Sequence, residues 1–386
     1  MTTLSARPLR AMLAGPLVAA LVAALVGALL PATAHAQRRT ENVVLIVTDG
    51  VRWQDVFRGP ERRLMSRTPG GVGDTSALVR DFWRDDPVQR RATLLPFLWS
   101  TVAKQGVIYG NQDRGSVARI TNRFRFSYPG YSELFTGFAD DRIDSNEYPP
   151  NPNTTVFEWF AKQPGFRGKV GAVATWSVFR SILNEERAGI DVLDGWDEPF
   201  PGALGRDPRR ALVNDLYRTS LRYWPGNAFD APMHLAAKEY IRLRKPRLLF
   251  VGYGETDEWA HGRRYDLTLR SLHQVDAFIA DLWSHMQGIR QYRGRTTFII
   301  TTDHGRGGGA DDWTSHGEDV DGAEDIWMAI IGPDTPALGE LLGGERVTQS
   351  QVAATIAALL GKEDAYRAAS PRSAPAVREA LGRPRP

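Results

Sequence analysis

The sequence of 386 residues predicts an α/β protein, an α/β/α sandwich in which helices cover both faces of a mostly parallel sheet. Two observations support this fold class. Short, continuous runs of apolar and β-branched residues recur along the chain, as expected for strands that are buried on both faces. Stretches with the helical spacing of apolar residues separate these runs, which is the order of a doubly covered sheet. The composition, with 42% hydrophobic and 24% charged residues, is typical of a globular protein.

The strands are expected where apolar runs are unbroken. The run Asn42–Thr48 predicts the first strand, and further strands are expected at Lys169–Thr175, Arg247–Tyr253, Thr296–Thr302 and Ile326–Ile331. Helices are expected between them at Leu95–Gln105, Thr154–Lys162, Pro232–Leu243, Tyr265–Gln287 and Gln349–Leu360. Sites in such sheets lie outside the carboxyl ends of the strands, so polar residues that follow strands are the candidates for function.

Three stretches depart from this alternation. Residues 53–91 and 191–227 are rich in Gly, Arg, Pro or Trp, and we expect them to be loop excursions over the rim of the site. Surface loops without a role in substrate binding are the alternative. The Ala-, Arg- and Pro-rich residues 362–386 predict a loosely ordered tail, which leaves residues 37–361 as a single domain.

The first 36 residues have the features of a secretory signal peptide. Two arginines precede an apolar run over residues 11–30, and an Ala-x-Ala site ends at Ala36, so cleavage is expected before Gln37. A membrane anchor is the alternative, since the run is close to the roughly 20 residues that span a bilayer. Pro16 and the Ala-x-Ala site favour cleavage. We therefore expect an exported protein, periplasmic or secreted, with no stable membrane anchor after cleavage.

Charge and cysteine content exclude several classes of function. The net charge is +3, and loss of the first 36 residues with Arg7 and Arg10 would leave +1. A chain this close to neutral predicts no nucleic-acid-binding surface. The sequence contains no cysteine, which excludes disulfides, thiolate metal sites and a cysteine nucleophile.

Carboxylates and histidines gather at or just beyond the ends of the expected strands. These candidate metal ligands are Asp49, Asp257, His261, Asp303, His304 and His316, of which His316 alone lies further on, in the loop after one of those strands. Asp257 and His261 are four residues apart, so on a helical turn they would share one face. Taken alone, each residue could have a purely structural role: an aspartate in a turn, a side chain that caps a helix, or a histidine in a surface loop. Together, three carboxylates and three imidazoles suit two metal ions with three protein ligands each, which leaves positions open for substrate.

Ser127 is the candidate nucleophile. It precedes a Pro-Gly turn and a short helical pattern that ends at Thr136-Gly137, which places its hydroxyl near a helix N-terminus. Free backbone N–H groups at such a position favour anions, whereas a helix N-cap is the alternative role of the serine. Tyr131, four residues further on, is a candidate to line the substrate pocket.

The order of these motifs resembles the alkaline phosphatase superfamily, and most closely its nucleotide pyrophosphatase/phosphodiesterase branch with the exported bacterial relatives of that branch. The family pattern is an Asp after the first strand, a Thr or Ser before a Pro-containing turn ending in Thr-Gly, Asp-x-x-x-His, Asp-His and a final His-Gly. Every part occurs here in that order across residues 41–361. The resemblance implies an alkaline-phosphatase-like fold and a catalytic role for residues 37–361.

The resemblance also implies a role for each candidate residue. It assigns one divalent metal ion, expected to be zinc, to Asp257, His261 and His316, and a second to Asp49, Asp303 and His304. Ser127 becomes the nucleophile, and Asn146 is placed where relatives hold a phosphoryl oxygen. The expected substrate is a small-molecule phosphoric monoester or diester, hydrolysed through a covalent phosphoserine.

Other members of the superfamily remain alternatives. Sulfatases carry Cys or Ser followed by x-Pro-x-Arg, whereas Tyr131 occupies the Arg position here. Phosphoglycerate mutases share the metal core, but their serine motif and large inserted domain are not evident. A non-catalytic metal-binding protein on the same fold is the alternative of another class; loss of a ligand or of Ser127 would favour it, and none is lost.

Overall fold

The computed structural model describes residues 2–3 and 38–382. The apolar run and the Ala-x-Ala site of the expected signal peptide lie outside the described residues, as do the last four residues of the chain. Residues 38–382 belong to one compact unit. Within the described ranges, no helix has the length and apolar character needed to cross a membrane.

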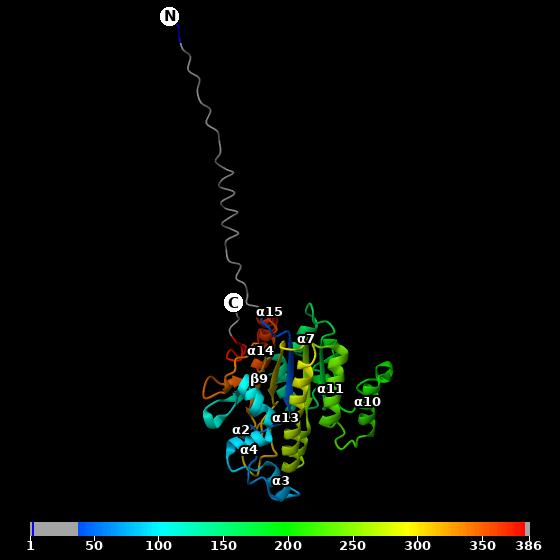
Figure 1. Ribbon diagram of the computed structural model, residues 1–386, viewed down its shortest axis with the longest axis vertical. Helices are drawn as coiled ribbons and strands as arrows, with labels where there is room; N and C mark the ends of the chain where they lie inside the picture. The colour runs from blue at the N-terminus through cyan, green and yellow to red at the C-terminus, as the bar shows by residue number, and fades with distance from the viewer. Residues whose placement is uncertain (1, 4–37, 383–386) are drawn as a thin grey trace. The chain divides into compact units, whose positions relative to one another are not determined.

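The centre of this unit is an eight-stranded sheet (Figure 1). The strands are β1 Asn42–Thr48, β2 Val107–Tyr109, β3 Ala118–Arg119, β4 Val170–Ala174, β5 Asp191–Leu193, β6 Leu248–Tyr253, β7 Thr296–Thr301, β8 Asp325–Ile326, β9 Met328–Ile331, β10 Gly339–Glu340 and β11 Val347–Thr348. Their order in the large sheet is β10-β2-β9-β7-β1-β6-β4-β5, and β11-β3-β8 form a second sheet. Strand β9 is antiparallel to both of its neighbours, whereas the other pairs of the large sheet are parallel.

Helices cover both faces of the large sheet. They are α2 Trp53–Arg58, α3 Thr75–Phe82, α4 Pro87–Leu94, α5 Ala103–Gln105, α6 Ser127–Thr136, α7 Val156–Ala161, α8 Phe179–Ile182, α9 Glu185–Ala188, α10 Pro208–Thr219, α11 Asp230–Arg244, α12 Glu255–His261, α13 Tyr265–Gln287, α14 Gln351–Leu359 and α15 Glu363–Ala369. Val44 and Ile46 of β1 pack in one hydrophobic cluster with α11 and α13. Val43, Leu45 and Val47 pack in another with α6, α7 and α14. The predicted α/β/α sandwich is therefore confirmed.

The expected strands are present, but the last is divided. Strand β1 has the predicted bounds, and β4, β6 and β7 lie within one residue of theirs. The run Ile326–Ile331 instead supplies two strands, β8 and β9, which belong to different sheets. The division falls at Trp327, whose carbonyl accepts a hydrogen bond from the Thr301 hydroxyl at 2.6 Å. The reversed direction of β9 is the departure from an all-parallel sheet.

The helix expected over Leu95–Gln105 starts later and is irregular. A π-helical segment, Leu98–Val102, precedes α5. Leu95 has a non-helical backbone because it precedes Pro96, and a residue before proline avoids the helical region. The Asp276 carboxylate then accepts hydrogen bonds from the backbone N–H groups of residues 97 and 98, at 2.7 and 2.9 Å. This long-range cap sets the start of the helical turn.

Both excursions contain secondary structure and touch the segments around α12. Residues 53–91 include α2, α3 and most of α4, and residues 191–227 include β5, a 3-10 turn and α10. In the first excursion, Gly70 accepts a hydrogen bond from the backbone N–H of Tyr265 at 2.9 Å. In the second, the Asn227 side chain donates to Glu258 of α12 at 3.0 Å.

The expectation of a loosely ordered tail is wrong for residues 362–382. This segment forms α15, and Tyr366 is buried and donates from its hydroxyl to the Thr136 carbonyl at 2.9 Å. Further on, the backbone N–H of Val377 donates to the Thr355 hydroxyl at 2.9 Å. Although this segment is rich in Ala and Pro, it contains a few apolar side chains that pack in one hydrophobic cluster with residues of α6 and α14.

Asp334 brings the two ends of the described unit together. Its carboxylate accepts hydrogen bonds from the backbone N–H groups of Arg39 and Thr40, at 3.1 and 2.6 Å. Its carbonyl accepts one from Gly382 at 2.7 Å. The beginning and the end of the described unit are therefore neighbours.

Candidate active site

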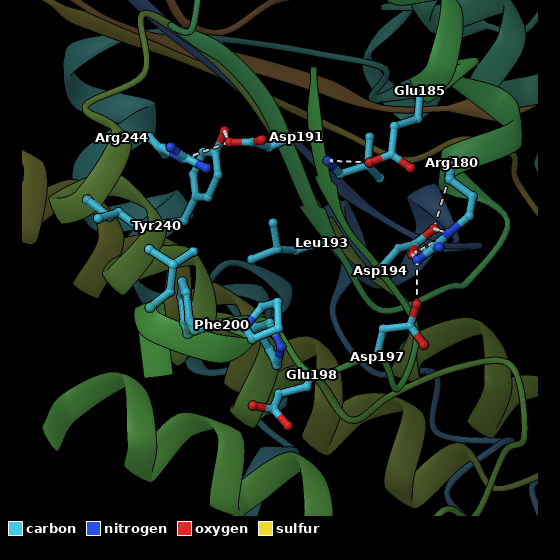
Figure 2. A pocket seen from close by; sticks show the side chains of 15 residues that line it. Arg180, Glu185, Asp191, Leu193, Asp194, Asp197, Glu198, Phe200, Tyr240 and Arg244 are labelled. Carbon is cyan, nitrogen blue, oxygen red and sulfur yellow. Dashed lines mark hydrogen bonds and ion pairs between the residues drawn. The ribbon is translucent and has the colours of Figure 1, made fainter. Parts of the chain in front are cut away.

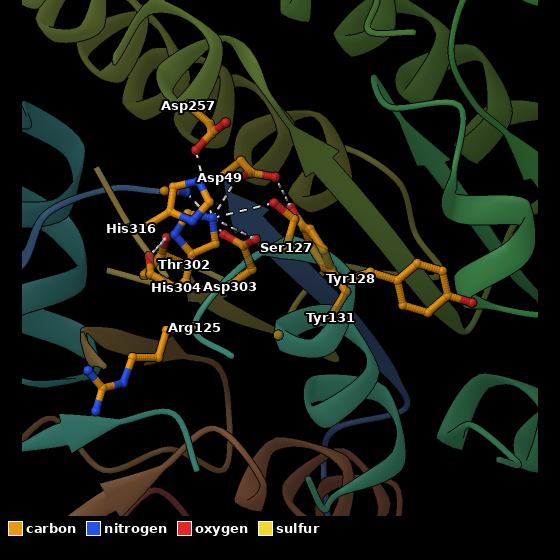
Figure 3. A network of polar contacts seen from close by, with 12 residues as sticks. Asp49, Arg125, Ser127, Tyr128, Tyr131, Asp257, Thr302, Asp303, His304 and His316 are labelled. Atoms are coloured by element: carbon orange, nitrogen blue, oxygen red, sulfur yellow. Dashed lines mark hydrogen bonds and ion pairs between the residues drawn. The ribbon is translucent and has the colours of Figure 1, made fainter. Parts of the chain in front are cut away.

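The six expected ligands and Ser127 converge at the carboxyl ends of β1, β6 and β7. Figure 3 labels all of these residues except His261. Their ligand atoms form two groups, Asp257/His261/His316 and Asp49/Asp303/His304, and within each group these atoms lie within 4.8 Å of one another. This is the grouping that the resemblance implies. The parallel sheet explains it, because the polar residues that follow adjacent strands emerge at one edge.

The first group is the more exposed one. His261 Nε2 lies 3.2 Å from an oxygen of Asp257, and the two side chains are 49% and 14% exposed. His316 Nε2 lies 3.0 Å from His261 Nε2. Two imidazole nitrogens and a carboxylate oxygen that face one point are a donor set that zinc binds. The helical spacing of Asp257 and His261 on α12 produces the shared face expected from the sequence.

The second group is buried. The side chains of Asp303 and His304 are 0% exposed and that of Asp49 is 9% exposed. His304 Nε2 lies 3.5 Å from Asp303 Oδ2 and 3.6 Å from Asp49 Oδ1. Among residues 38–382, neither of these carboxylate oxygens has a hydrogen-bond partner. Unpartnered buried carboxylate oxygens are costly unless a cation compensates them, so this group fits a metal ion.

The protonation states agree with that fit. Burial, with the charges of Asp303 and Asp257, raises the pKa of Asp49 well above its usual value. Burial and the Asp257 charge raise the pKa of Asp303 to about 7. Burial lowers the pKa of His304 to about 4, so its imidazole is neutral near pH 7. Crowded carboxylates that repel one another and a neutral imidazole are stabilised by bound cations.

Backbone contacts orient the buried ligands. His304 Nδ1 lies 2.9 Å from the Gly305 carbonyl, which requires the proton on Nδ1 and leaves the Nε2 lone pair free for a metal. The Gly50 N–H donates to Asp303 Oδ1 at 3.0 Å. The Thr256 hydroxyl of α12 donates to the carbonyl of Asp49 at 2.6 Å. The ends of β1 and β7 are thus fixed relative to each other and to α12.

Two residues that hold ligands were not assigned that role from the sequence. Tyr131 is 1% exposed and donates a hydrogen bond from its hydroxyl to Asp49 Oδ2 at 2.9 Å, so it supports an expected ligand instead of lining a pocket. Arg306 is also 1% exposed and pairs with Asp257. Burial alone would raise the pKa of Asp257, but the charge of Arg306 together with the contributions of His261 and His316 holds that pKa well below its usual value. The position of Arg306 directly after Asp-His-Gly was the available signal.

Ser127 is the first residue of α6, and its hydroxyl oxygen lies 3.4 Å from His304 Nε2. The N-cap residue Phe126 makes no side-chain cap. Asn146 Oδ1 instead accepts the backbone N–H of Tyr128 at 2.9 Å, which places the Asn146 amide beside the nucleophile. Among the described residues, the NH₂ group of Asn146 donates to no acceptor. The predicted contact of Asn146 with a phosphoryl oxygen stays a prediction.

The loop that leads to Ser127 is fixed by Glu133 of the same helix. Glu133 is fully buried and accepts hydrogen bonds from the backbone and side chain of both Thr121 and Asn122, at 2.8–3.0 Å. The Asn122 side chain accepts the backbone N–H of Arg125, which has a left-handed backbone with φ of 53°. The Arg125 side chain points away from the ligands (Figure 3). Glu133 thereby sets the approach of the chain to the nucleophile.

A separate cavity of about 270 Å³ contains none of these residues (Figure 2). It is lined by acidic and basic side chains near β5 and α11. Asp194 pairs with Arg180, and Arg244 lies 2.8 Å from Asp191. Both arginines of this cavity thus pair with aspartates, whereas the carboxylates of Asp49 and Asp303 pair with no arginine or lysine among the described residues.

Solved structures share the fold. The wild-type alkaline phosphatase PafA is 10% identical, with a TM-score of 0.54, over 90% of this chain and 99% of that chain. Ps i-CgsB, solved with k-i-k-neocarrahexaose, is 15% identical, with a TM-score of 0.51, over 86% of this chain and 74% of that one. A Bacteroides thetaiotaomicron structure described with glycosaminoglycan metabolism is 16% identical, with a TM-score of 0.50, over 89% and 82%. At these identities the likeness concerns the fold alone.

A family comparison adds more than the fold. No curated protein matches this chain. The family model described as type I phosphodiesterase/nucleotide pyrophosphatase matches residues 63–381. That match covers well over half of the sequence, includes five of the six expected ligands and Ser127, and indicates a hydrolase of phosphoric esters. The protein therefore belongs to the type I phosphodiesterase/nucleotide pyrophosphatase family.

Proposed function

We propose that this protein is an exported hydrolase of small phosphoric esters that binds two zinc ions and acts through a phosphoserine on Ser127. The observation that carries the proposal is the position of the Ser127 hydroxyl, at a helix N-terminus and 3.4 Å from Nε2 of the expected ligand His304. A serine at that position can reach a phosphorus atom held against the metal ligands. The family match supports the same reaction class.

Each group in the proposed reaction has a defined task. Bound zinc ions would supply Lewis-acid stabilisation of the serine oxygen and of the leaving oxygen. Ser127 Oγ forms a bond to phosphorus while the bond from phosphorus to the leaving alkoxide breaks. The serine proton passes to solvent, and the alkoxide is released as the alcohol. Water then cleaves the phosphoserine, which restores the serine and releases the phosphate product.

The surrounding residues position the ester and the nucleophile. The first turn of α6 directs its helix dipole toward the phosphoryl group, which favours an anion. The NH₂ group of Asn146 is available to donate to a phosphoryl oxygen, since its Oδ1 is held by the Tyr128 N–H. Positioning and charge stabilisation supply most of the catalysis in this reaction class.

Zinc is the proposed metal because each group combines imidazole with carboxylate. Imidazole nitrogen suits transition metals, whereas magnesium prefers oxygen ligands and retains bound water. The proposed partner is the small-molecule ester itself, with no nucleic acid. Export is inferred from the sequence of residues 1–36, so mass spectrometry of the native protein should find Gln37 at the N-terminus.

Paired assays test the proposal. The purified protein should hydrolyse an aryl phosphate monoester, an aryl phosphate diester or both, and aryl sulfate serves as the control substrate for a sulfatase. Ser127→Ala should lower turnover by about a thousandfold or more while metal content is kept. Ser132→Ala, the same change in the same helix, is the matched control and should keep most of the activity. Acid quenching during turnover should trap a phosphate on the peptide that contains Ser127.

Two results would contradict the proposal. Retention of more than about a tenth of the rate by Ser127→Ala would show that Ser127 is not the nucleophile. Full activity in protein freed of metal by a chelator would exclude the two-metal reaction. Faster turnover of the aryl sulfate than of either phosphate ester would favour the sulfatase alternative.

A further inference from the structure

Arg306 is a fully buried arginine whose guanidinium joins three separate parts of the chain. Its Nε donates to the carbonyl of Gly50 at 3.0 Å. Its Nη1 donates to the carbonyl of Thr314. Its Nη2 donates to the carboxylate of Asp257, and to the carbonyl of the same residue at 3.3 Å. All three nitrogens of the guanidinium therefore have protein acceptors.

Each acceptor is an expected metal ligand or lies within two residues of one in the sequence. Gly50 directly follows Asp49, and Thr314 precedes His316 by two residues. Asp257 is itself a ligand and begins the turn of α12 that ends at His261. The guanidinium also follows His304 by two residues in the sequence. One side chain thus contacts or belongs to all four segments that supply ligands.

Residues 305–317, which include His316, need contacts of this kind to be held in one conformation. Residues 305–317 contain five glycines, and glycine loses more conformational freedom on ordering than any other residue. In this segment the backbone N–H of Gly307 donates to the Ser315 carbonyl at 3.0 Å. The Arg306 contact with Thr314 closes the same loop from its other side. Together these bonds hold His316 against His261.

The buried ligand group has supports of its own. Asp303 is fixed by the Gly50 N–H at 3.0 Å, and the Val51 N–H donates to the Thr302 hydroxyl at 3.0 Å. The Thr302 hydroxyl in turn donates to the His304 carbonyl at 3.0 Å. These bonds do not involve the guanidinium. Loss of Arg306 should therefore affect the two groups unequally.

We propose that Arg306 is a positioning residue that assembles the Asp257/His261/His316 site before a metal ion binds there. The inference rests on the proposed two-metal function, since it takes these residues as ligands. A planar guanidinium can donate in several fixed directions at once, which an ammonium on a flexible stem cannot do. Arg306→Lys should therefore keep the charge next to Asp257 but lose the simultaneous contacts with Gly50 and Thr314.

The experiment measures metal binding and loop order, not hydrolysis. Arg306→Met should weaken zinc binding at one of the two sites by about tenfold or more in chelator competition, and leave the other within a few-fold. In metal-free protein, hydrogen exchange of peptides from residues 305–317 should be faster in the variant than in the wild type. For Arg306→Lys, both the zinc affinity and the exchange rate should lie between those of Arg306→Met and the wild type. Arg91→Met removes an 11%-exposed arginine paired with Glu340, away from the ligands, and should change neither measurement.

Several outcomes would overturn the inference. It fails if Arg306→Met binds both zinc ions with wild-type affinity and its 305–317 peptides exchange at the wild-type rate. If that variant does not fold, the wild type still decides: loop peptides that exchange as fast as an unfolded chain in metal-free protein exclude preassembly. Equal zinc affinity of Arg306→Lys and wild type would show that charge alone suffices. Zinc affinity and hydrogen exchange are measured without an ester substrate. A failure of the proposed hydrolysis would therefore appear in the turnover assays and would not change these two measurements.

Discussion

Tyr131 donates its hydroxyl proton to Asp49 Oδ2 at 2.9 Å, inside the core and 82 residues away in the sequence. Burial, with the nearby carboxylate charges, raises the pKa of Tyr131 well above its usual value, so the phenol stays protonated and acts as a donor. The other oxygen, Asp49 Oδ1, finds no hydrogen-bond partner within the part of the chain that the structure describes, and it lies 3.6 Å from His304 Nε2. Tyr131 therefore leaves one oxygen of Asp49 for a metal ion.

Tyr131→Phe should weaken the buried metal site. Loss of a group that holds a ligand typically lowers metal affinity about 10- to 100-fold. Zinc affinity and turnover should be measured together by chelator competition and aryl phosphate hydrolysis. Tyr128→Phe is the matched control, since it removes a hydroxyl of the same helix that donates to the Pro149 carbonyl. Similar affinities in the two variants would show that the Tyr131 hydroxyl does not support the site.

Mild chelation should remove one zinc before the other. His261 in the first group is half exposed, whereas the second group is buried, so the first should exchange metal faster. His316→Ala should leave about one zinc per chain and lower the rate by orders of magnitude, because one metal cannot stabilise both attacking and leaving oxygens. Metal content and rate should be followed across a zinc titration. Two tightly bound zinc ions with normal kinetics in His316→Ala would remove His316 from the ligand set.

Glu133→Gln should slow the reaction without removing metal. The new amide would place its N–H₂ group against the N–H and hydroxyl donors of Thr121 and Asn122, so at least one would lose its acceptor. We expect the rate to fall about 10- to 100-fold with two zinc ions still bound, because misplacing a reacting group is sufficient for such a loss. Glu158→Gln is the control, as it alters an equally buried glutamate paired with Arg187. Wild-type turnover in Glu133→Gln would show that this glutamate does not position the nucleophile.

Asp276 should make stability depend on pH. Burial raises its pKa to about 6, against the opposing effect of its hydrogen bonds to residues 97 and 98. A raised carboxyl pKa means that the folded state binds the proton more tightly than the unfolded state. Its favourable contribution is therefore complete below about pH 4 and is lost as the pH rises through about 6.

Asp276→Asn removes this titration. From pH 4 to pH 7, the free energy of unfolding of the wild type should fall relative to that of the variant by up to about 3 kcal/mol. Urea unfolding of both proteins at the two pH values measures the difference. If the difference in the free energy of unfolding between the wild type and Asp276→Asn does not change with pH, the Asp276 carboxyl has an ordinary pKa in the folded state.

The elements that could be predicted from the sequence have strong local signals. Strand β1 is buried on both faces, so the five residues between Asn42 and Thr48 form an unbroken apolar run, and the predicted bounds match the observed ones. The candidate ligands were found because parallel strands end at one edge, where their following residues meet. Short strands gave no such signal: β2 and β5 have three residues each, too few to establish a period.

The supporting contacts could not be predicted because they join distant segments. Arg306 and Gly50 are 256 residues apart, and nothing in the composition around either residue indicates the other. The burial of Tyr366 was missed for a related reason. The residues around Tyr366 are polar or small, so the local sequence does not indicate a buried segment. The burial becomes evident only in the fold, where the Tyr366 ring packs with residues of α6 and α14 and its hydroxyl donates to the Thr136 carbonyl.

The shared contacts of Asp334 with Arg39, Thr40 and Gly382 have a consequence for topology. Because the two ends of the described unit meet at one residue, a short linker between them would close the backbone into a ring with little strain. New termini could then be opened at an exposed turn such as Gly202, where an added side chain would meet no neighbour. Such a circular permutant would make β1 an interior segment of the chain, with both of its sheet neighbours, β6 and β7, placed before it in the sequence, while every expected ligand kept its place in space.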